Sequence, residues 1–176
     1  MRWTLDTAHA EVEFAAKHLM ISTVKGRFKV FDGDGTTDAQ GHLQSVRMEI
    51  DAASIDTNTA DRDKHLRSPD FLDTDKFPKI TFDSTKVTQD GDEVTIEGNL
   101  TIRGVTKPIT LKGEYMAPAK DPWGKERAAL SVSGKVNRKD WGLTWNVALE
   151  TGGVLVSEEI KVRIEVEAVA AEAAAA

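Results

Sequence analysis

The residues best suited to do chemistry gather in one short stretch of the chain. Arg62, Asp63, His65, Arg67 and Asp70 lie close together in the sequence. A guanidinium group binds phosphate and carbonyl oxygens, and an imidazole beside carboxylates can hold a cation or transfer a proton. The same acidic residues are typical of a solvated surface at the start of a helix, where the helix dipole favours negative charge. For the carboxylates, the sequence favours this second interpretation.

A second polar group follows a late apolar segment and contains Arg138 and Asp140, with Trp141 and Trp145 beside them. An ion pair between Arg138 and Asp140 would tie the loop down, whereas a free Arg138 would meet an anionic ligand. We expect the ion pair and keep the ligand contact as the alternative. The four tryptophans of the chain either line an interior or close its ends.

Motifs of common catalytic and metal sites are missing from the sequence. It has no GxSxG or HExxH motif, and its four histidines are scattered along the chain. The run Asp32-Gly-Asp-Gly superficially suggests a calcium loop, but Leu43 stands where a bidentate glutamate is required. Cysteine is absent, so disulfides and thiolate ligands are excluded. We therefore predict no enzyme, no catalytic residues, no metal and no cofactor.

Size and composition indicate one globular domain. The chain has 176 residues, 40% of them hydrophobic, and a net charge of −6, which argues against nucleic-acid binding. Its first residues lack the apolar run of a signal peptide, so we expect a cytoplasmic protein, or a periplasmic one if the N-terminus was trimmed. We assign residues 1–168 to a single barrel domain and residues 169–176 to an alanine-rich tail.

Most of the chain alternates apolar and polar residues with a period of two, which is typical of half-buried strands. Short turns join the segments, so the pattern predicts an all-β fold with an antiparallel sheet. Eight strands of this kind could close into a barrel or stack as a sandwich. The eight predicted strands cover residues 12–18, 24–30, 46–52, 80–87, 94–102, 109–115, 128–136 and 160–166.

The alternation is interrupted around residues 58–76, where we predict a short helical insertion at one end of the sheet structure. Asn58 or Thr59 could cap a helix, and Ser68-Pro69 should end it, because the residue before a proline is disfavoured in helical geometry. The glycine-rich run at residues 32–35 is predicted to be a turn.

The apolar faces of the strands carry unusually small residues. Gly98, Gly113 and Gly134 occupy the middle of the apolar faces of three successive predicted strands. Glycines let strands bend so that a barrel can close, or they leave the interior unfilled, and both interpretations stay open. No charged residue lies in the middle of an apolar face, so a cavity there would suit a long hydrocarbon chain.

Several motifs resemble those of the YceI-like family of lipocalin-like polyisoprenoid-binding proteins. They extend from about Trp3 to about Ala168, and the chain has Trp141 where the family usually has phenylalanine. The resemblance implies a lipocalin-like barrel that binds polyprenyl phosphates or isoprenoid quinones. The motifs that carry it include Asp6-Thr-Ala-His-Ala-Glu-Val-Glu-Phe, Arg62-Asp-Lys-His-Leu-Arg-Ser-Pro-Asp-Phe-Leu-Asp, Leu100-Thr-Ile-Arg-Gly-Val-Thr-Lys and Arg138-Lys-Asp-Trp-Gly.

Together, the pattern and the resemblance predict an eight-stranded antiparallel lipocalin-like barrel that binds, stores or transports a long-chain isoprenoid lipid. His18 could instead be a hydrogen-bonded core residue. Arg62, His65 and Arg138 are the candidates for contact with a lipid head group. The predicted lumen residues are Phe14, Ala16, His18, Phe28, Met48, Ile50, Phe71, Phe82, Ile96, Gly98, Leu100, Leu111, Gly113, Leu130, Val132, Gly134, Trp141, Trp145 and Ile164.

Two other functions remain as alternatives. The barrel could be a solid-core structural or interaction module whose glycines serve only curvature, or a lipid-modifying enzyme with a polar mouth that uses His65 or Asp140. The expected partner is the isoprenoid lipid and not nucleic acid. A transient contact with a membrane surface and a homodimer are compatible with the sequence.

Overall fold

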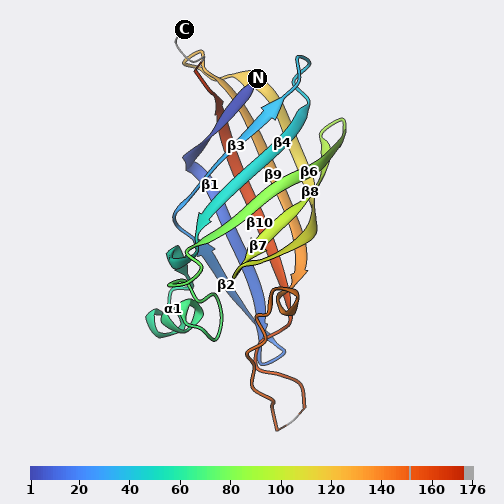
Figure 1. The fold of residues 1–176 in the computed structure, drawn as a ribbon. Coiled ribbons are helices and arrows are strands. Elements are labelled where there is room, and N and C mark those ends of the chain that lie inside the picture. Colours follow the sequence, from blue (N-terminus) through green and yellow to red (C-terminus); the bar gives the residue numbers. More distant parts are fainter. Residues whose placement is uncertain (151, 173–176) are drawn as a thin grey trace.

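The computed structural model describes residues 1–150 and 152–172, which form a closed antiparallel β-barrel with a short helix at one end (Figure 1). The described strands lie in the order β10-β9-β8-β7-β6-β4-β3-β1-β2-β5, and a pairing of β10 with β1 closes the sheet. Their bounds are β1 (Arg2–His18), β2 (Ser22–Phe28), β3 (Phe31–Thr37), β4 (Leu43–Asp51), β5 (Ile55–Asp56), β6 (Lys79–Asp90), β7 (Glu93–Ile102), β8 (Val105–Lys120), β9 (Glu126–Asn137) and β10 (Glu159–Ala170).

The closed ring has eight strand positions because β2 and β3 share one position beside β1, and β5, which pairs with β2, continues the position of β4, which pairs with β3. Residues 12–18 of β1 pair with β2, and residues 2–4 of β1 pair with β3. The predicted eight-stranded antiparallel barrel is therefore confirmed. The β10 strand runs to Ala170, and residues 173–176 of the predicted tail lie outside the described residues.

The turn predicted at residues 32–35 is wrong, because these residues belong to β3 and pair with β4. Their glycines allow the two backbones to approach closely. A Cβ atom on Gly33 would lie 2.7 Å from the carbonyl oxygen of Arg47, which is closer than real Cβ atoms come. The glycines here serve strand packing, and composition alone could not distinguish this from a turn.

The predicted helical insertion is confirmed as a short helix, α1 (Ala60–Arg67), at one end of the barrel (Figure 1). Two 3₁₀ turns, η1 (Ala52–Ser54) and η2 (Arg138–Trp141), lie elsewhere in the chain. The buried carboxylate of Asp63 accepts hydrogen bonds from the backbone N–H of Thr57 at 2.8 Å and from its hydroxyl at 2.5 Å. These bonds fix the helix to the segment before it. Among the described helices, none is long and apolar enough to span a bilayer.

The opposite end of the barrel is covered by buried side chains. Trp3, Leu43 and Tyr115 belong to one core cluster and are each less than a tenth exposed. The Trp3 indole donates a 2.9 Å hydrogen bond to the Thr37 hydroxyl, and the Tyr115 hydroxyl donates one of 3.0 Å to the carbonyl oxygen of Gly41. Burial raises the pKa of Tyr115. We call this the closed end of the barrel.

Candidate functional site: an apolar cavity along the barrel axis

The barrel encloses a cavity of about 610 Å³ that extends from the closed end to helix α1. Trp3 and Tyr115 border it at one end, and Arg62 and His65 border it at the other. This volume lies within the range of small-molecule sites, which usually have apolar walls and a few placed polar groups. The solid-core alternative requires an interior filled by the protein's own side chains. The cavity shows that the interior is not filled in this way.

The walls are built by the inward halves of the alternating strands, as the period-two pattern predicted. Whether these side chains touch a ligand stays a prediction, but the structure places nearly all the predicted lumen residues at the cavity. Those that border it are Phe14, Ala16, His18, Phe28, Met48, Ile50, Phe71, Phe82, Ile96, Leu100, Leu111, Leu130, Val132, Trp141, Trp145 and Ile164.

The three glycines predicted to open the lumen do not border the cavity. A Cβ atom on Gly98 would lie 2.6 Å from the carbonyl oxygen of Asp83 and would also clash with the ring of Phe82. On Gly134 it would lie 2.8 Å from the carbonyl oxygen of Thr110, and on Gly113 it would overlap backbone atoms of β9. These glycines provide close strand packing and room for a neighbouring ring, so they do not open the lumen as predicted.

The cavity walls are less covered towards the helix than at the closed end. Phe14, Ala16 and Phe28 face the cavity there and are only half-buried, whereas Ile96 and Val132 further along are almost fully buried. The Phe14 and Phe28 rings pack with their centroids 5.7 Å apart. Covering such apolar surface with a hydrocarbon chain removes it from water and so lowers the free energy of the complex.

The mouth of the cavity is formed by α1 and by the residues before β10. We call residues 142–150 and 152–158 the mouth loop. The His65 ring lies edge-on to Phe71 and Trp145, with centroid distances of 5.1 and 4.6 Å, and its Nε2 lies 2.9 Å from a carboxylate oxygen of Asp70. Arg103 holds the Phe71 backbone through a 2.8 Å hydrogen bond to its carbonyl oxygen. His65 therefore acts as part of an aromatic rim, already bound to Asp70.

Arg62 borders the cavity and retains free hydrogen-bonding capacity. Its Nε donates to the Thr57 hydroxyl at 2.8 Å, and its Nη2 donates to the Thr57 carbonyl oxygen at 2.7 Å. Its Nη1 makes no hydrogen bond to any described residue. Since a guanidinium has five N–H donors, Arg62 is both held in place and able to bind an anion. Asp61, which precedes Arg62 in the helix, also borders the cavity.

The ion pair predicted between Arg138 and Asp140 is not formed. Arg138 is buried and donates instead to four backbone carbonyl oxygens of the mouth loop, those of Leu143, Trp145, Val156 and Ser157, at 2.6 to 3.3 Å. Burial lowers its pKa. The predicted role of fixing the loop therefore holds, but with carbonyl acceptors, and these bonds use four of its five donors.

His18 borders the cavity near the mouth, and its backbone bridges to Val156 of the mouth loop. The ring makes no hydrogen bond to the described part of the protein, so the alternative of a hydrogen-bonded core histidine is not supported. The tryptophans take different positions. Trp3 covers the closed end, Trp141 is buried and donates to the Leu100 carbonyl oxygen at 2.9 Å, and Trp123 is 81% exposed.

Apart from Trp145, sequence reasoning missed the cavity residues contributed by the mouth loop, namely Leu143, Leu155 and Val156. This loop has no regular alternation from which an inward face could be assigned. The available signal was the apolar run Val154-Leu155-Val156, two residues before β10. Such a run in a loop indicates contact with an apolar interior.

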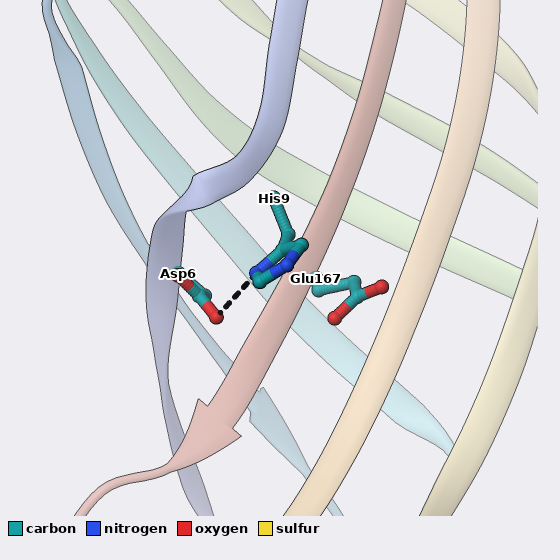
Figure 2. Close-up of side chains that lie close together, drawn as sticks. All are labelled: Asp6, His9 and Glu167. Carbon is teal, nitrogen blue, oxygen red and sulfur yellow. Dashed lines mark hydrogen bonds and ion pairs between the residues drawn. The ribbon is translucent and has the colours of Figure 1, made fainter.

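A separate polar cluster lies on the outer wall, where β1 bulges beside β10. Figure 2 shows Asp6, His9 and Glu167 close enough together to hold a metal ion. Arg127 already occupies the cluster, because its Nη1 lies 2.8 Å from Asp6 and 3.3 Å from Glu167. The hydrogen bond from Arg127 to Asp6 and, to a smaller extent, the one from His9 lower the pKa of Asp6 to about 2. The cluster is an ion-pair network that ties the bulge to the adjacent strands.

The fold and the cavity define the protein as a closed β-barrel with an apolar internal binding site. The family model described as "YceI-like domain" matches residues 3–168, so the chain belongs to the YceI-like domain family. Protein YceI of Salmonella newport is 44% identical over 162 residues, which is 92% of this chain and 82% of that protein.

Solved structures show the same architecture. The crystal structure of the Campylobacter jejuni YCEI protein has a TM-score of 0.78 and 35% identity, and the match covers 89% of this chain and 90% of that one. A polyisoprenoid binding domain from Saccharophagus degradans matches with a TM-score of 0.67 and 16% identity, covering 96% of this chain and 98% of that domain. At that identity, the second match shows a common fold.

Proposed function

We propose that this protein binds a long-chain isoprenoid lipid in its lumen and stores or transports it without chemical change. The observation that carries the proposal is the continuous apolar cavity of about 610 Å³ between the closed end and helix α1. The Saccharophagus degradans domain of the same fold is described as polyisoprenoid-binding, which supports the same ligand class.

The wall chemistry favours a hydrocarbon chain over a sugar or nucleotide. Leucine, isoleucine, valine and phenylalanine side chains dominate the lining, so few donors or acceptors are available to replace the water lost by a polar ligand. Each methylene group moved from water into such a site contributes about 0.8 kcal/mol. A chain of many carbons would therefore bind tightly without specific polar contacts.

The lipid head group would lie at the mouth, where the polar residues of the cavity are found. Arg62 is the strongest candidate for contact with it, because its Nη1 bonds to no described residue, whereas Arg138 makes four bonds to the mouth loop and His65 bonds to Asp70. The free Nη1 of Arg62 suits a phosphate oxygen, and the His18 ring offers one further polar contact nearby. A phosphate or a quinone carbonyl could be bound in this way.

Two adjacent alanines of β1 give a matched test. Ala16 borders the cavity, whereas Ala15 does not and alternates to the other face of the strand. Ala16→Phe should lower the affinity for a polyprenyl phosphate at least about tenfold, since it removes space for several methylenes. Ala15→Phe should leave the affinity nearly unchanged.

The measurement is retention of a radiolabelled polyprenyl phosphate by each folded variant on gel filtration, with circular dichroism to confirm the fold. Equal losses in both variants, or none in either, would contradict binding in the lumen. A wild-type protein that retains no polyprenyl lipid at all would remove the proposal.

A further inference from the structure

At the mouth end of the barrel, the hairpin that joins β1 to β2 has exposed apolar side chains at its tip. The tip that joins β1 to β2 consists of Leu19, Met20 and Ile21, which are 48%, 59% and 83% exposed. It is joined to the mouth loop by a 2.9 Å hydrogen bond from the Leu19 N–H to the Leu155 carbonyl oxygen. Val147 of the mouth loop is also exposed. Figure 1 shows this hairpin and the mouth loop at the end opposite both termini.

The backbone of the hairpin tip is unfavourable for the residues it contains. Leu19 and Met20 have φ angles of 52° and 65°, in the left-handed region that glycine and asparagine prefer. Bulky apolar residues at two successive positions of this kind are unusual, and folding alone would favour Asn-Gly. Strain of this type, kept together with exposed apolar side chains, points to a function for the side chains.

The outer wall behind the tip is basic. Lys25, Lys161 and Lys135 lie in one row across β2, β10 and β9, because both Lys25 and Lys161 pair with Ala15 and Lys161 pairs with Lys135. They alternate with cavity-lining residues, so they point outward, and all three are exposed. Lys25 and Lys161 form no ion pair with the described residues.

The next row away from the mouth contains Arg27, Glu13, Arg163 and Lys112, whereas the row beyond it contains Glu11, Glu165 and Glu114. Apart from Glu159, which lies 3.9 Å from Lys135, the charge of this wall changes from mainly basic near the mouth to acidic towards the closed end, although the whole chain carries a net charge of −6. An anionic surface would attract the basic part of this wall and repel its acidic part.

We propose that the Leu19–Ile21 tip and the basic row of Lys25, Lys135 and Lys161 form a docking surface for an anionic lipid bilayer. The apolar tip enters the interfacial region while the lysines meet the lipid head groups. In this orientation the cavity mouth faces the bilayer, so a hydrocarbon chain can pass between membrane and lumen with little exposure to water. The inference goes beyond lumen binding and is testable without any isoprenoid.

The test uses sedimentation with vesicles of phosphatidylcholine alone and with vesicles enriched in phosphatidylglycerol. Wild-type protein should bind the anionic vesicles and should bind phosphatidylcholine more weakly. Ile21→Asp should lower the affinity about tenfold, because a fully exposed apolar anchor is lost. Trp123→Asp is the matched control, since Trp123 is similarly exposed at 81% but lies in the β8–β9 turn at the closed end. The affinity of Trp123→Asp for the anionic vesicles should change less than about twofold.

A double variant, Leu19→Asn with Met20→Gly, tests the strained tip directly. It should weaken vesicle binding while raising the melting temperature, because the new residues accept positive φ. Three results would overturn the proposal. They are a wild-type protein that does not bind anionic vesicles, equal losses in Ile21→Asp and Trp123→Asp, and a tip that instead mediates dimerisation, seen as a concentration-dependent dimer that Ile21→Asp abolishes without any vesicle binding. Because the vesicles lack isoprenoids, these results are independent of cargo binding.

Discussion

The guanidinium of Arg138 donates a 2.9 Å hydrogen bond to the carbonyl oxygen of Trp145. The Trp145 ring in turn lies edge-on to His65 of helix α1. The arginine thus connects the end of β9 to the aromatic rim of the cavity mouth through the backbone of the mouth loop. The position of the rim depends on a buried charge that has only carbonyl acceptors.

Replacing Arg138 by alanine should release the mouth loop. Four carbonyl oxygens would lose their donor, so we expect a loss of about 3 kcal/mol in the free energy of unfolding. Urea unfolding measures this, and tryptophan emission should shift to the red as Trp145 becomes hydrated. Lys139→Ala removes only a surface ion pair with Glu158 and should cost less than about 0.5 kcal/mol. A stability loss no larger for Arg138→Ala than for Lys139→Ala would contradict this role.

Arg62 should discriminate between charged and neutral lipids. With Arg62→Gln, the affinity for a polyprenyl phosphate should fall about tenfold, because a charge-assisted hydrogen bond is lost, and the affinity for the matching polyprenol should stay nearly constant. Arg67→Gln is the control, since Arg67 lies on the same helix but does not border the cavity. If Arg62→Gln lowers the affinity for both lipids equally, the arginine positions the residues of the mouth and does not bind the head group.

The glycines should respond to substitution according to what lies above them. A Cβ atom on Gly26 would meet only side chains, including Phe14 and the methyl group of Thr57 at 2.9 Å, whereas one on Gly113 would meet backbone atoms of β9. The stability lost in Gly26→Ala should therefore be restored at least partly by Phe14→Leu. Gly113→Ala should lower the free energy of unfolding by about 2 kcal/mol or more, and no side-chain change should restore it. Thermal unfolding measures both. A well-tolerated Gly113→Ala would contradict the close-packing interpretation.

The ion-pair network of Asp6 and Arg127 should make the barrel sensitive to acid. The pKa of Asp6 is lowered from 3.8 to about 2 in the folded protein, so its stabilisation is complete above about pH 4 and is lost as the pH falls towards 2. We expect about 1 kcal/mol after allowing for solvent screening.

Urea unfolding at pH 6 and near pH 3 measures this loss. It should be smaller in Asp6→Asn than in the wild type, and unchanged in the control Asp75→Asn, which replaces an exposed carboxylate elsewhere. The same pH dependence in Asp6→Asn and wild type would show that the network does not contribute.

The alternation of side chains predicted most of the barrel and most of its lining. Strands such as β7 and β10 carry one apolar face, and that face determines which side chains point inward. The helical insertion followed from Ser68-Pro69 and the polar residues before it. These features depend on local sequence, so local reasoning was sufficient.

The features that sequence could not give depend on contacts between distant segments. The β3 strand contains Asp-Gly repeats typical of turns, and its strand conformation depends on pairing with β4. The glycines had two possible roles, and only the position of the facing backbone distinguishes them. The acceptors of Arg138 are carbonyl oxygens, which every residue has, so no residue type could have identified them.

Native mass spectrometry of the purified wild-type protein mixed with a polyprenyl phosphate tests the central claim most directly. We predict a complex of one lipid per chain that survives gentle ionisation and is much less abundant for Ala16→Phe than for Ala15→Phe. A spectrum that contains only the bare 19.3 kDa chain, from folded protein offered excess lipid, would contradict a lipid-binding lumen.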